Sequence, residues 1–282
     1  ERYEDLIADP AVDVIDLLTL PTLREDAVRA AAATHKPIIT EKPLAATMAE
    51  AERMVSIAAE AGIPLGVHQN YRWMSTNYVV RELLERGWIG APFLLSIEIF
   101  GTQDRHLAGH AYYATCTDFL PVQWNNHLAD LLRYWTGRDA LRVWATTRRM
   151  AGQKFVSDNL LISIHDFGPG VTGHILHHEL LQVDAPSQPC RIDGDSGSLV
   201  FDLWGDSIAI HSVRLGGSPR ELQLQPLGLP HSMAGSMGDF LSAVEEGREP
   251  MVSGRANLAT LRAIFGELES ARRGGAWISV SG

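Results

Sequence analysis

Three features are scarce in this 282-residue sequence, and each scarcity excludes a class of protein. Only Cys116 and Cys190 occur, far apart along the chain, so we expect free thiols rather than a disulfide framework or a zinc ribbon. No uncharged apolar run approaches the roughly 20 residues of a membrane-spanning helix, and no secretory signal is recognisable. Positive charge is in deficit, because the formal net charge is −10, so nucleic acid is not an expected partner. We therefore expect a cytoplasmic protein without membrane contact.

The first part of the chain, residues 1–90, alternates between strand-like and helix-like segments. Because parallel strands need crossover helices, this alternation predicts a doubly wound parallel sheet, which binds ligands at the carboxyl ends of its strands. Thr47 and Glu50 form a capping box and Gly62 ends the same helix. The expected strands are 12–20, 37–40 and 64–68, and the expected helices are 24–34, 47–61 and 77–85.

The second part, residues 91–282, is mostly strand-like, and Gly, Asp and Pro turns separate its segments. Consecutive strands of this kind predict a large, open and mainly antiparallel sheet. The expected strands are 93–100, 140–147, 160–165, 171–183, 198–203 and 207–213, and the expected helices are 127–136, 236–246 and 256–272. The predicted fold class is therefore α/β: a partial doubly wound sheet, followed by an α+β domain whose final helices return to the first domain.

The sequence Thr40-Glu41-Lys42-Pro43-Leu44 lies where a ligand would bind, at the carboxyl end of an expected parallel strand. Proline keeps the backbone of the preceding residue extended, which directs the Lys42 side chain. An ammonium group is a compact donor whose pKa responds to burial, so Lys42 suits contact with both a cofactor and a substrate hydroxyl. The alternative is a solvated lysine at a turn.

Four motifs in order resemble the Gfo/Idh/MocA family, oxidoreductases that use NAD(P) on sugars, inositols and related polyols. They are Glu41-Lys42-Pro43-Leu44, Gly66-Val67-His68-Gln69-Asn70-Tyr71-Arg72, His127-Leu128-Ala129-Asp130-Leu131-Leu132-Arg133 and Glu246-Gly247-Arg248-Glu249-Pro250. The resemblance implies a nucleotide-binding domain (1–90) followed by a substrate and oligomerisation domain (91–282). It also implies a homo-oligomer, a dimer or tetramer, formed through the large sheet.

The resemblance implies a role for each matching residue. Lys42 would orient the nicotinamide ribose and the reacting hydroxyl, and His127 would take the alcohol proton, which suits an imidazole that titrates near neutral pH. A histidine that packs or caps at the start of a helix is the alternative for His127. The expected substrate-binding residues are Tyr71, Arg72, Gln123 and Asn126, and the expected cofactor-binding residues are Leu20, Pro21, Glu41, Lys42, Pro43 and Asn70.

Two of the neighbouring charged residues have a structural alternative. Arg72 could hold substrate hydroxyl or carboxylate groups, or it could form an ion pair with a residue of the protein. Asp130 lies one helical turn after His127 and could orient the imidazole, or it could have a capping or surface role.

The sequence departs from the family in its glycines, since none precedes Gly62. The family begins with a glycine-rich turn that cradles the pyrophosphate of NAD or NADP, and only a backbone without side chains can approach so closely. We therefore expect that roughly 55 to 60 residues of a first βαβαβ half are missing. The apolar strand 12–20 would need that segment, or another chain, as its partner.

A second departure is Gln123, because the family commonly places an Asp four residues before the histidine. An amide cannot act as a base, but it can still donate and accept hydrogen bonds. This substitution would leave proton transfer to His127 and Lys42.

The sequence His174-Ile175-Leu176-His177-His178-Glu179 invites a metal interpretation, which we do not favour. Side chains alternate between the faces of a strand, so His174 and His178 share one face, while His177 and Glu179 share the other. This splits any set of four ligands, and we expect no metal site.

The function expected first is that of an NAD(P)-dependent oxidoreductase, which transfers a hydride between a nicotinamide cofactor and a secondary alcohol of a sugar or polyol. Two alternatives stay open because the glycine-rich cradle is absent from this chain and Gln123 replaces an acid. One is a cofactor-independent lyase, isomerase or glycosidic-bond cleaving enzyme that uses His127, and the other is a non-catalytic subunit.

Overall fold

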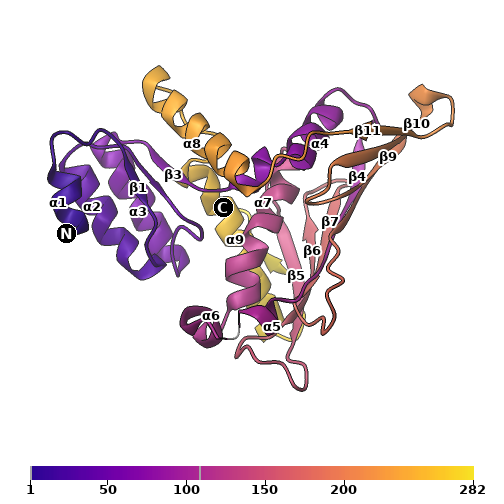
Figure 1. Ribbon diagram of the computed structural model, residues 1–282, viewed down its shortest axis with the longest axis horizontal. Helices are drawn as coiled ribbons and strands as arrows, with labels where there is room; N and C mark the ends of the chain where they lie inside the picture. Colours follow the sequence, from indigo (N-terminus) through magenta and orange to yellow (C-terminus); the bar gives the residue numbers. More distant parts are fainter. Residues whose placement is uncertain (1, 108) are drawn as a thin grey trace.

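A computed structural model describes residues 2–107 and 109–282 of the protein. It forms two units that meet at an angle (Figure 1). The smaller unit, drawn in indigo and purple, contains the beginning of the chain. The larger unit contains a broad sheet, and α7 (Asn125–Thr136) and α9 (Gly254–Arg272) lie between that sheet and the smaller unit (Figure 1).

The smaller unit contains a parallel sheet, which we call the small sheet. In the described residues its strand order is β1-β2-β3, and Ile38 of the middle strand pairs with Ile15 on one side and Leu65 on the other. Ile38 and Ile39 are both fully buried, as expected for a strand that is covered on both faces. The strands are β1 (Ile15–Leu17), β2 (Ile38–Thr40) and β3 (Leu65–Val67), and the helices are α1 (Tyr3–Ala8), α2 (Arg24–Ala33) and α3 (Met48–Ala61). The next helix, α4 (Ser75–Glu85), lies beside α7 of the larger unit (Figure 1).

The capping predicted for α3 is confirmed. Thr47 accepts a hydrogen bond from the Glu50 amide, the Glu50 side chain accepts one from the Thr47 amide, and Gly62 ends the helix with a φ of 67°. These caps fix where α3 begins, and therefore how many residues connect it to the end of β2. The connecting residues contain Lys42.

The larger unit contains the large sheet, whose strand order in the described residues is β11-β10-β9-β8-β4-β7-β6-β5-β12. Only β4 and β7 pair in parallel, so the prediction of a mainly antiparallel sheet is confirmed. The strands are β4 (Pro92–Phe100), β5 (Arg142–Arg148), β6 (Leu160–Asp166), β7 (Thr172–His178), β8 (Pro189–Gly194), β9 (Gly197–Asp202), β10 (Ser207–Ser212), β11 (Arg220–Gln223) and β12 (Ile278–Ser279).

Helices cover one face of the large sheet. Packing of α7 against α9 and of α9 against β5 joins the helices to the sheet, and α9 also contacts α3 of the smaller unit. The remaining helices are α5 (Gln103–His106), α6 (Ala111–Thr115) and α8 (Leu229–Glu246). Helix α9 therefore contacts both units.

The structure corrects several predicted boundaries. The strand expected over 171–183 ends at His178, because the chain then turns and the Glu179 carboxylate is buried. Helix α8 begins at Leu229 rather than at residue 236, and its Gly235 packs so closely on Trp73 that a Cβ would lie 2.5 Å from the ring. The short strands β8, β11 and β12 and helix α1 were not predicted, because their segments are too short and polar to show a clear period.

One edge of the small sheet has no partner strand in the described part of the chain, since β1 pairs only with β2. Beside this edge lies a cavity of about 580 Å³ bounded by α1 and β1. Which segment covers β1 therefore stays a prediction. Within the described residues, no helix is long and apolar enough to span a membrane.

Candidate functional site

Lys42 lies at the carboxyl end of β2, where the chain leaves the small sheet. Its ammonium Nζ donates to the carbonyl oxygen of Gln123 at 2.8 Å, so it bridges from the smaller unit to the larger one. Burial lowers the pKa of Lys42 to about 8, while the Glu41 carboxylate opposes this shift and the Arg24 guanidinium adds to it. The group is therefore an ammonium at neutral pH that can lose its proton in mild alkali.

Arg24, at the start of α2, holds the backbone on both sides of Lys42. Its side chain is only 2% exposed, and it donates to the carbonyl oxygens of Glu41 and Pro43, and to that of Thr19 at 2.6 Å. These bonds tie the loop after β1 to the loop after β2. A guanidinium with several fixed donors suits this task, since one side chain can reach three carbonyl groups.

Gln123 contributes to the site through its main chain as well as its side chain. It lies in a π-helical turn, Phe119–Trp124, just before α7, and wider turns of this kind leave carbonyl groups without regular helical partners. The Gln123 carbonyl accepts from Lys42, while its side-chain Nε2 donates to the Tyr112 hydroxyl at 2.8 Å. A role of its amide in holding substrate stays a prediction.

His127 lies in the first turn of α7 and is 5% exposed. Its ring stacks on Tyr71, with the ring centroids 4.0 Å apart and the planes 3° from parallel. Burial, and then the positive charge of Lys42, lower the pKa of His127 well below its ordinary value. Its Nδ1 atom is buried without a hydrogen-bond partner in the described part of the structure. The imidazole is therefore neutral at physiological pH and able to accept a proton.

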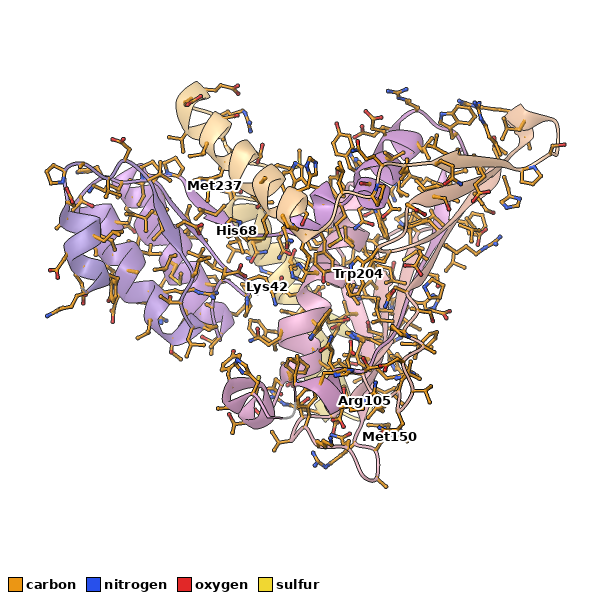
Figure 2. The ribbon with its side chains drawn as sticks, viewed as in Figure 1. Lys42, His68, Arg105, Met150, Trp204 and Met237 are labelled. Carbon is orange, nitrogen blue, oxygen red and sulfur yellow. The ribbon has the colours of Figure 1, made fainter. Side chains whose placement is uncertain are left out.

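The two predicted catalytic groups interact electrostatically, because the positive charge of Lys42 contributes to the lowered pKa of His127. Lys42 comes from the smaller unit and His127 from the larger one. Figure 2 shows Lys42 at the junction of the units, on the side that faces the large sheet. Two cavities flank this junction.

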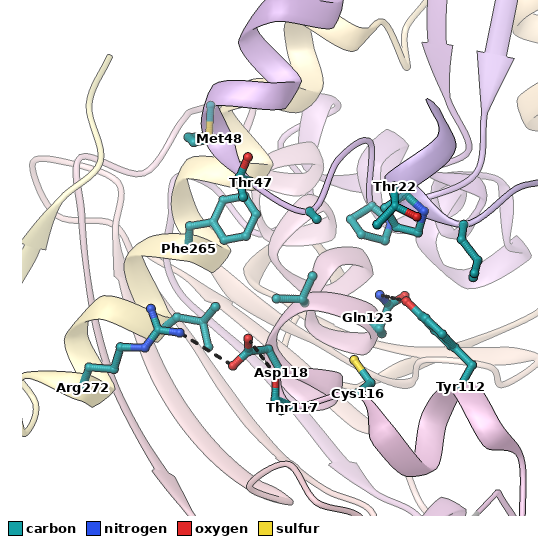
Figure 3. A pocket seen from close by; sticks show the side chains of 16 residues that line it. Thr22, Thr47, Met48, Tyr112, Cys116, Thr117, Asp118, Gln123, Phe265 and Arg272 are labelled. Carbon is teal, nitrogen blue, oxygen red and sulfur yellow. Dashed lines mark hydrogen bonds and ion pairs between the residues drawn. The ribbon is translucent and has the colours of Figure 1, made fainter. Parts of the chain in front are cut away.

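The first cavity, which we call the junction cavity, has a volume of about 580 Å³ (Figure 3). It adjoins the carboxyl ends of β1 and β2, where a doubly wound sheet binds its ligand. Four of the predicted residues contribute to it. Its lining consists of Leu20, Pro21, Thr22, Pro43, Ala46, Thr47, Met48, Tyr112, Cys116, Thr117, Asp118, Val122, Gln123, Phe265, Leu268 and Arg272.

The second cavity, which we call the aromatic cavity, has a volume of about 500 Å³ and lies against the large sheet. Its wall includes Tyr71, whose ring also stacks on that of His127. Its lining consists of Tyr71, Met74, Ser75, Thr76, Gln103, Trp124, Trp204, Gly205, Pro226, Leu227, Gly228 and Leu229. Among the predicted substrate residues, Tyr71 lines this cavity and Gln123 lines the other.

Arg72 follows the structural alternative that the sequence left open. Its guanidinium makes two hydrogen bonds to the Asp130 carboxylate, at 2.6 and 2.7 Å, and one to the Met251 carbonyl. Asp130 also accepts from Thr260 at 3.0 Å. Asp130 is therefore committed to an ion pair rather than to His127, and a contact between Arg72 and substrate stays a prediction that this geometry does not favour.

The remaining predicted residues surround the centre. Asn126 is buried and accepts from the Gln69 side chain, and Asn70 donates to Ser232 at 2.9 Å. Glu41 lies beside Lys42, whose pKa it raises. The polar side chains of Asn126 and Asn70 thus bind other protein groups, and their roles toward substrate and cofactor stay predictions.

The histidine-rich strand β7 forms pairs rather than a cluster. His177 is buried and bonds to Glu179 at 2.9 Å, while His174 faces Ser96 at 3.2 Å on the other side of the strand. No group of three or more potential metal ligands occurs among the residues that the structure describes.

Sequence reasoning missed Arg24, Trp124 and Trp204. Arg24 could have been found, because it follows the carboxyl end of the first expected strand, within reach of the loop that contains Lys42. Trp124 and Trp204 gave no local signal, since they approach each other only when α7 and β9 pack together.

Comparison with known proteins agrees with this geometry. Residues 1–69 match the model of an oxidoreductase family with an NAD-binding Rossmann fold. D-apiose dehydrogenase from Paraburkholderia graminis is 25% identical over 284 residues, which cover 95% of this chain and 73% of that protein. D-apiose dehydrogenase from Rhizobium rhizogenes is 30% identical over 204 residues, which cover 70% of this chain and 58% of that protein.

Among solved structures, an oxidoreductase from Agrobacterium radiobacter is similar, with a TM-score of 0.88 and 26% identity. The match covers 98% of this chain and 82% of that one. That structure is a complex with NAD+, L-tartaric acid and magnesium.

Proposed function

The chain belongs to the Gfo/Idh/MocA family of oxidoreductases, and we propose that it catalyses hydride transfer between a nicotinamide cofactor and a secondary alcohol of a sugar or polyol. The observation that carries this proposal is the hydrogen bond by which Lys42 of the smaller unit reaches the Gln123 carbonyl, four residues before His127 in the larger unit. The smaller unit supplies the ammonium donor, and the larger unit supplies the imidazole.

His127 acts as the base in this reaction. An alcohol carbon can release a hydride only as its hydroxyl proton leaves, so a neutral imidazole within reach of that hydroxyl lowers the barrier. The desolvated environment keeps His127 neutral at physiological pH, and stacking on Tyr71 holds the ring in place. A correctly placed base typically contributes about 10²- to 10⁴-fold in rate.

Lys42 holds the hydroxyl that reacts. Its ammonium is fixed by the Gln123 carbonyl at 2.8 Å and retains donors for a second partner. A positive charge beside the hydroxyl favours the alkoxide character that develops as the proton moves to His127. Lys42 also keeps the imidazole neutral, because its charge lowers the pKa of His127.

The residues at the junction cavity fit the nicotinamide end of a dinucleotide. Leu20, Pro21 and Pro43 give the cavity apolar walls at the carboxyl ends of two parallel strands, and Lys42 stands beside them as a donor for a ribose hydroxyl. When bound there, the nicotinamide supplies the hydride acceptor or donor. Residues 2–61 contain no glycine, and no pyrophosphate cradle forms in the described part of the chain.

The similarity to D-apiose dehydrogenases supports a sugar as substrate. We further propose a homo-oligomer that forms through the large sheet, and a location in the cytoplasm. The uncovered face of that sheet supports the first of these proposals, since its strands carry half-buried side chains such as Ile164 and Leu176. Sedimentation of the purified protein tests this assembly, because a monomer at micromolar concentration would contradict it.

The test of the proposed activity uses protein expressed from the complete gene. Nicotinamide reduction is followed by absorbance with NAD+ and NADP+, against a panel of aldoses, inositols and acyclic polyols. We expect turnover with at least one member, together with calorimetric binding of one dinucleotide. If no dinucleotide binds and no substrate reduces it, the proposal fails, and a cofactor-independent reaction at His127 becomes the better explanation.

Two variants tie the activity to the site. His127→Asn keeps the size and polarity of the side chain but removes the base, so turnover should fall by about 10²-fold or more while dinucleotide binding is retained. His174→Asn is the matched control, because His174 lies on β7 beside Ser96 and outside both cavities. Equal turnover in the two variants would remove His127 from the mechanism.

A further inference from the structure

The aromatic cavity contains three large rings in series, beginning next to the proposed base. Tyr71 stacks on His127, and Trp204 stands edge-on to Tyr71 at 6.1 Å with the planes 80° apart. Trp124 lies 6.3 Å from Trp204 at an angle of 49°. The rings therefore extend from the reaction centre to the surface, where Trp204 is 43% exposed. Figure 2 shows Trp204 on the sheet side of the junction, to the right of Lys42.

Rings arranged in this way suit a ligand with an apolar face and a polar edge. Trp and Tyr side chains offer wide, rigid and largely apolar surfaces, which lose little conformational entropy when they are covered. The C–H groups on one face of a sugar ring form such an apolar surface, while its hydroxyl groups project around the edge. The neighbouring lining of Met74, Pro226 and Leu227 extends the apolar wall.

The wall contains an amide side chain that is available to a ligand, that of Gln103. The Ser75 hydroxyl donates to the Gln225 carbonyl at 2.7 Å, and the Thr76 hydroxyl donates to the Leu203 carbonyl at 2.9 Å. Neither hydroxyl therefore has a hydrogen atom left to donate to a ligand. The Gln103 side-chain amide bonds to no described residue, although its backbone amide donates to Glu179 at 3.1 Å. The Gln103 side chain can therefore donate to, and accept from, a ligand hydroxyl.

The charge around the cavity discriminates against anions. The lining contains no lysine, arginine or histidine that could neutralise a carboxylate or phosphate. The buried carboxylate of Glu179 lies beside the cavity, where it accepts from the backbone amide of Gln103 and pairs with His177. That carboxylate, after burial, is the second cause that raises the pKa of Tyr71, so its negative charge is felt at the cavity wall. An anionic ligand would lose its hydration there and gain no ion pair.

We propose that the aromatic cavity is a subsite for the non-reacting part of a neutral carbohydrate, with Trp204 and Trp124 against its apolar face and the Gln103 amide at one of its hydroxyl groups. The inference rests on the proposed function, because the reacting carbinol would lie at Lys42 and His127. It deepens that function by assigning a substrate class: neutral sugars and glycosides are accepted, whereas uronic acids and sugar phosphates are rejected.

Calorimetric titration of the complete protein, without nucleotide, tests the proposal. The probes are a panel of neutral aldoses and their methyl glycosides, each matched with its uronic acid and its phosphate ester. We expect at least one neutral member to bind, and its anionic counterparts to bind at least tenfold more weakly. Binding of no neutral member, or equal or tighter binding of the anions, would overturn the assignment.

Variants then locate the subsite. Trp204→Ala should weaken binding of the neutral probe by about tenfold, as is typical when an aromatic anchor is truncated, whereas Trp204→Phe should retain most of it. Trp277→Ala is the matched control, because Trp277 has a similar exposed fraction of 44% but lies against Arg142 and outside the aromatic cavity. If Trp204→Ala binds the probe as tightly as the Trp277→Ala control, the subsite is elsewhere.

The two proposals can fail separately. If sugar binding depends on Trp204 but no nicotinamide is reduced, the proposed function fails and the subsite stands. If turnover depends on His127 but neither binding nor the KM for neutral sugars depends on Trp204, the function stands and the subsite fails. Circular dichroism and the melting temperature of each variant show whether a loss of binding reflects a loss of fold.

Discussion

The small sheet and the large sheet each carry half of the candidate site, but they are built differently. The strands of the small sheet are three residues long, and in the described chain β1 has no partner on its outer edge. The strands of the large sheet from β4 to β10 contain six to nine residues, and each pairs on both sides.

This contrast indicates a division of labour between the units. The large sheet, whose strands from β4 to β10 pair on both sides, supplies a base for α7, and thus for His127. Lys42 instead lies on a loop of the smaller unit and is held by contacts that are specific to it, from Arg24 and the Gln123 carbonyl. We therefore expect the two units to respond differently to substitution.

The largest expected effect is the loss of turnover in Lys42→Met. Removing the ammonium deletes the donor to the reacting hydroxyl, so kcat should fall by about 10²- to 10⁴-fold, as for other positioned catalytic groups. The melting temperature should not fall by a comparable amount, because burial disfavours the charge of Lys42. A variant that unfolds as it loses activity would contradict the division proposed above.

The next effect concerns the ion pair between Arg72, after β3, and Asp130 of α7. Asp130→Asn leaves the guanidinium buried without its counter-charge, which typically costs about 3–5 kcal/mol of unfolding free energy. The Arg72 side chain is 8% exposed and the Asp130 side chain is 2% exposed. Chemical denaturation measures the loss. Glu85→Gln, which breaks the more exposed pair with Arg81, is the control and should cost less than about 1 kcal/mol. Equal losses would show that the junction pair contributes no more than a surface pair.

Arg24→Gln tests how the smaller unit holds Lys42. The variant loses the charged donors to Thr19, Glu41 and Pro43, and a hydrogen bond from a charged group typically contributes about 1.5–3 kcal/mol. We expect kcat to fall more than KM rises, since the loop moves but the walls of the aromatic cavity remain.

A merely structural role of Arg24 would not produce the accompanying change in pH dependence. Its charge lowers the pKa of Lys42, so the apparent alkaline pKa of turnover should rise in Arg24→Gln. Arg29→Gln, an exposed arginine of the same helix, is the control and should leave the profile unchanged. An unaltered alkaline limb in Arg24→Gln would argue against electrostatic coupling with Lys42.

The last effect is a pH dependence of stability, which is confined to alkaline solution. Lys42 has an ordinary pKa of 10.5 when unfolded and about 8 when folded. Between these values the unfolded chain binds a proton that the folded chain does not, so this lysine makes stability rise as the pH increases from about 8 to about 10.5. Lys42→Met should lack this contribution. Unfolding free energies of both proteins at the two ends of the window test it, and parallel curves would contradict the depressed pKa.

Much of the fold could be predicted from local patterns, whereas the site could be predicted only in part. The caps of α3 and the strand before Lys42 follow from residues within one turn of each other, such as Thr47 and Glu50. The resemblance named Lys42 and His127, and burial together with the positive charge of Lys42 lowers the pKa of His127. The sequence did not predict which groups of the protein contact Lys42 and His127.

The missing information is tertiary. Gln123 was expected to act through its amide, yet its carbonyl holds Lys42, which depends on the shape of the turn rather than on the residue type. Likewise, Arg72 and Asp130 lie 58 residues apart, and only the packing of α7 beside the turn Asn70–Trp73 shows that they are partners. Side chains from distant segments decide such contacts, so no period or motif reports them.

The wide turn Phe119–Trp124 has a consequence for how this protein can change. Such a turn accommodates one residue more than a regular helix, and each residue rotates a helix by about 100°. Deleting a single residue there would tighten the turn and move the Gln123 carbonyl away from the Lys42 ammonium, while α7 could keep its buried face. A related chain with an insertion or deletion at this point could therefore lose its catalytic activity and keep the same fold.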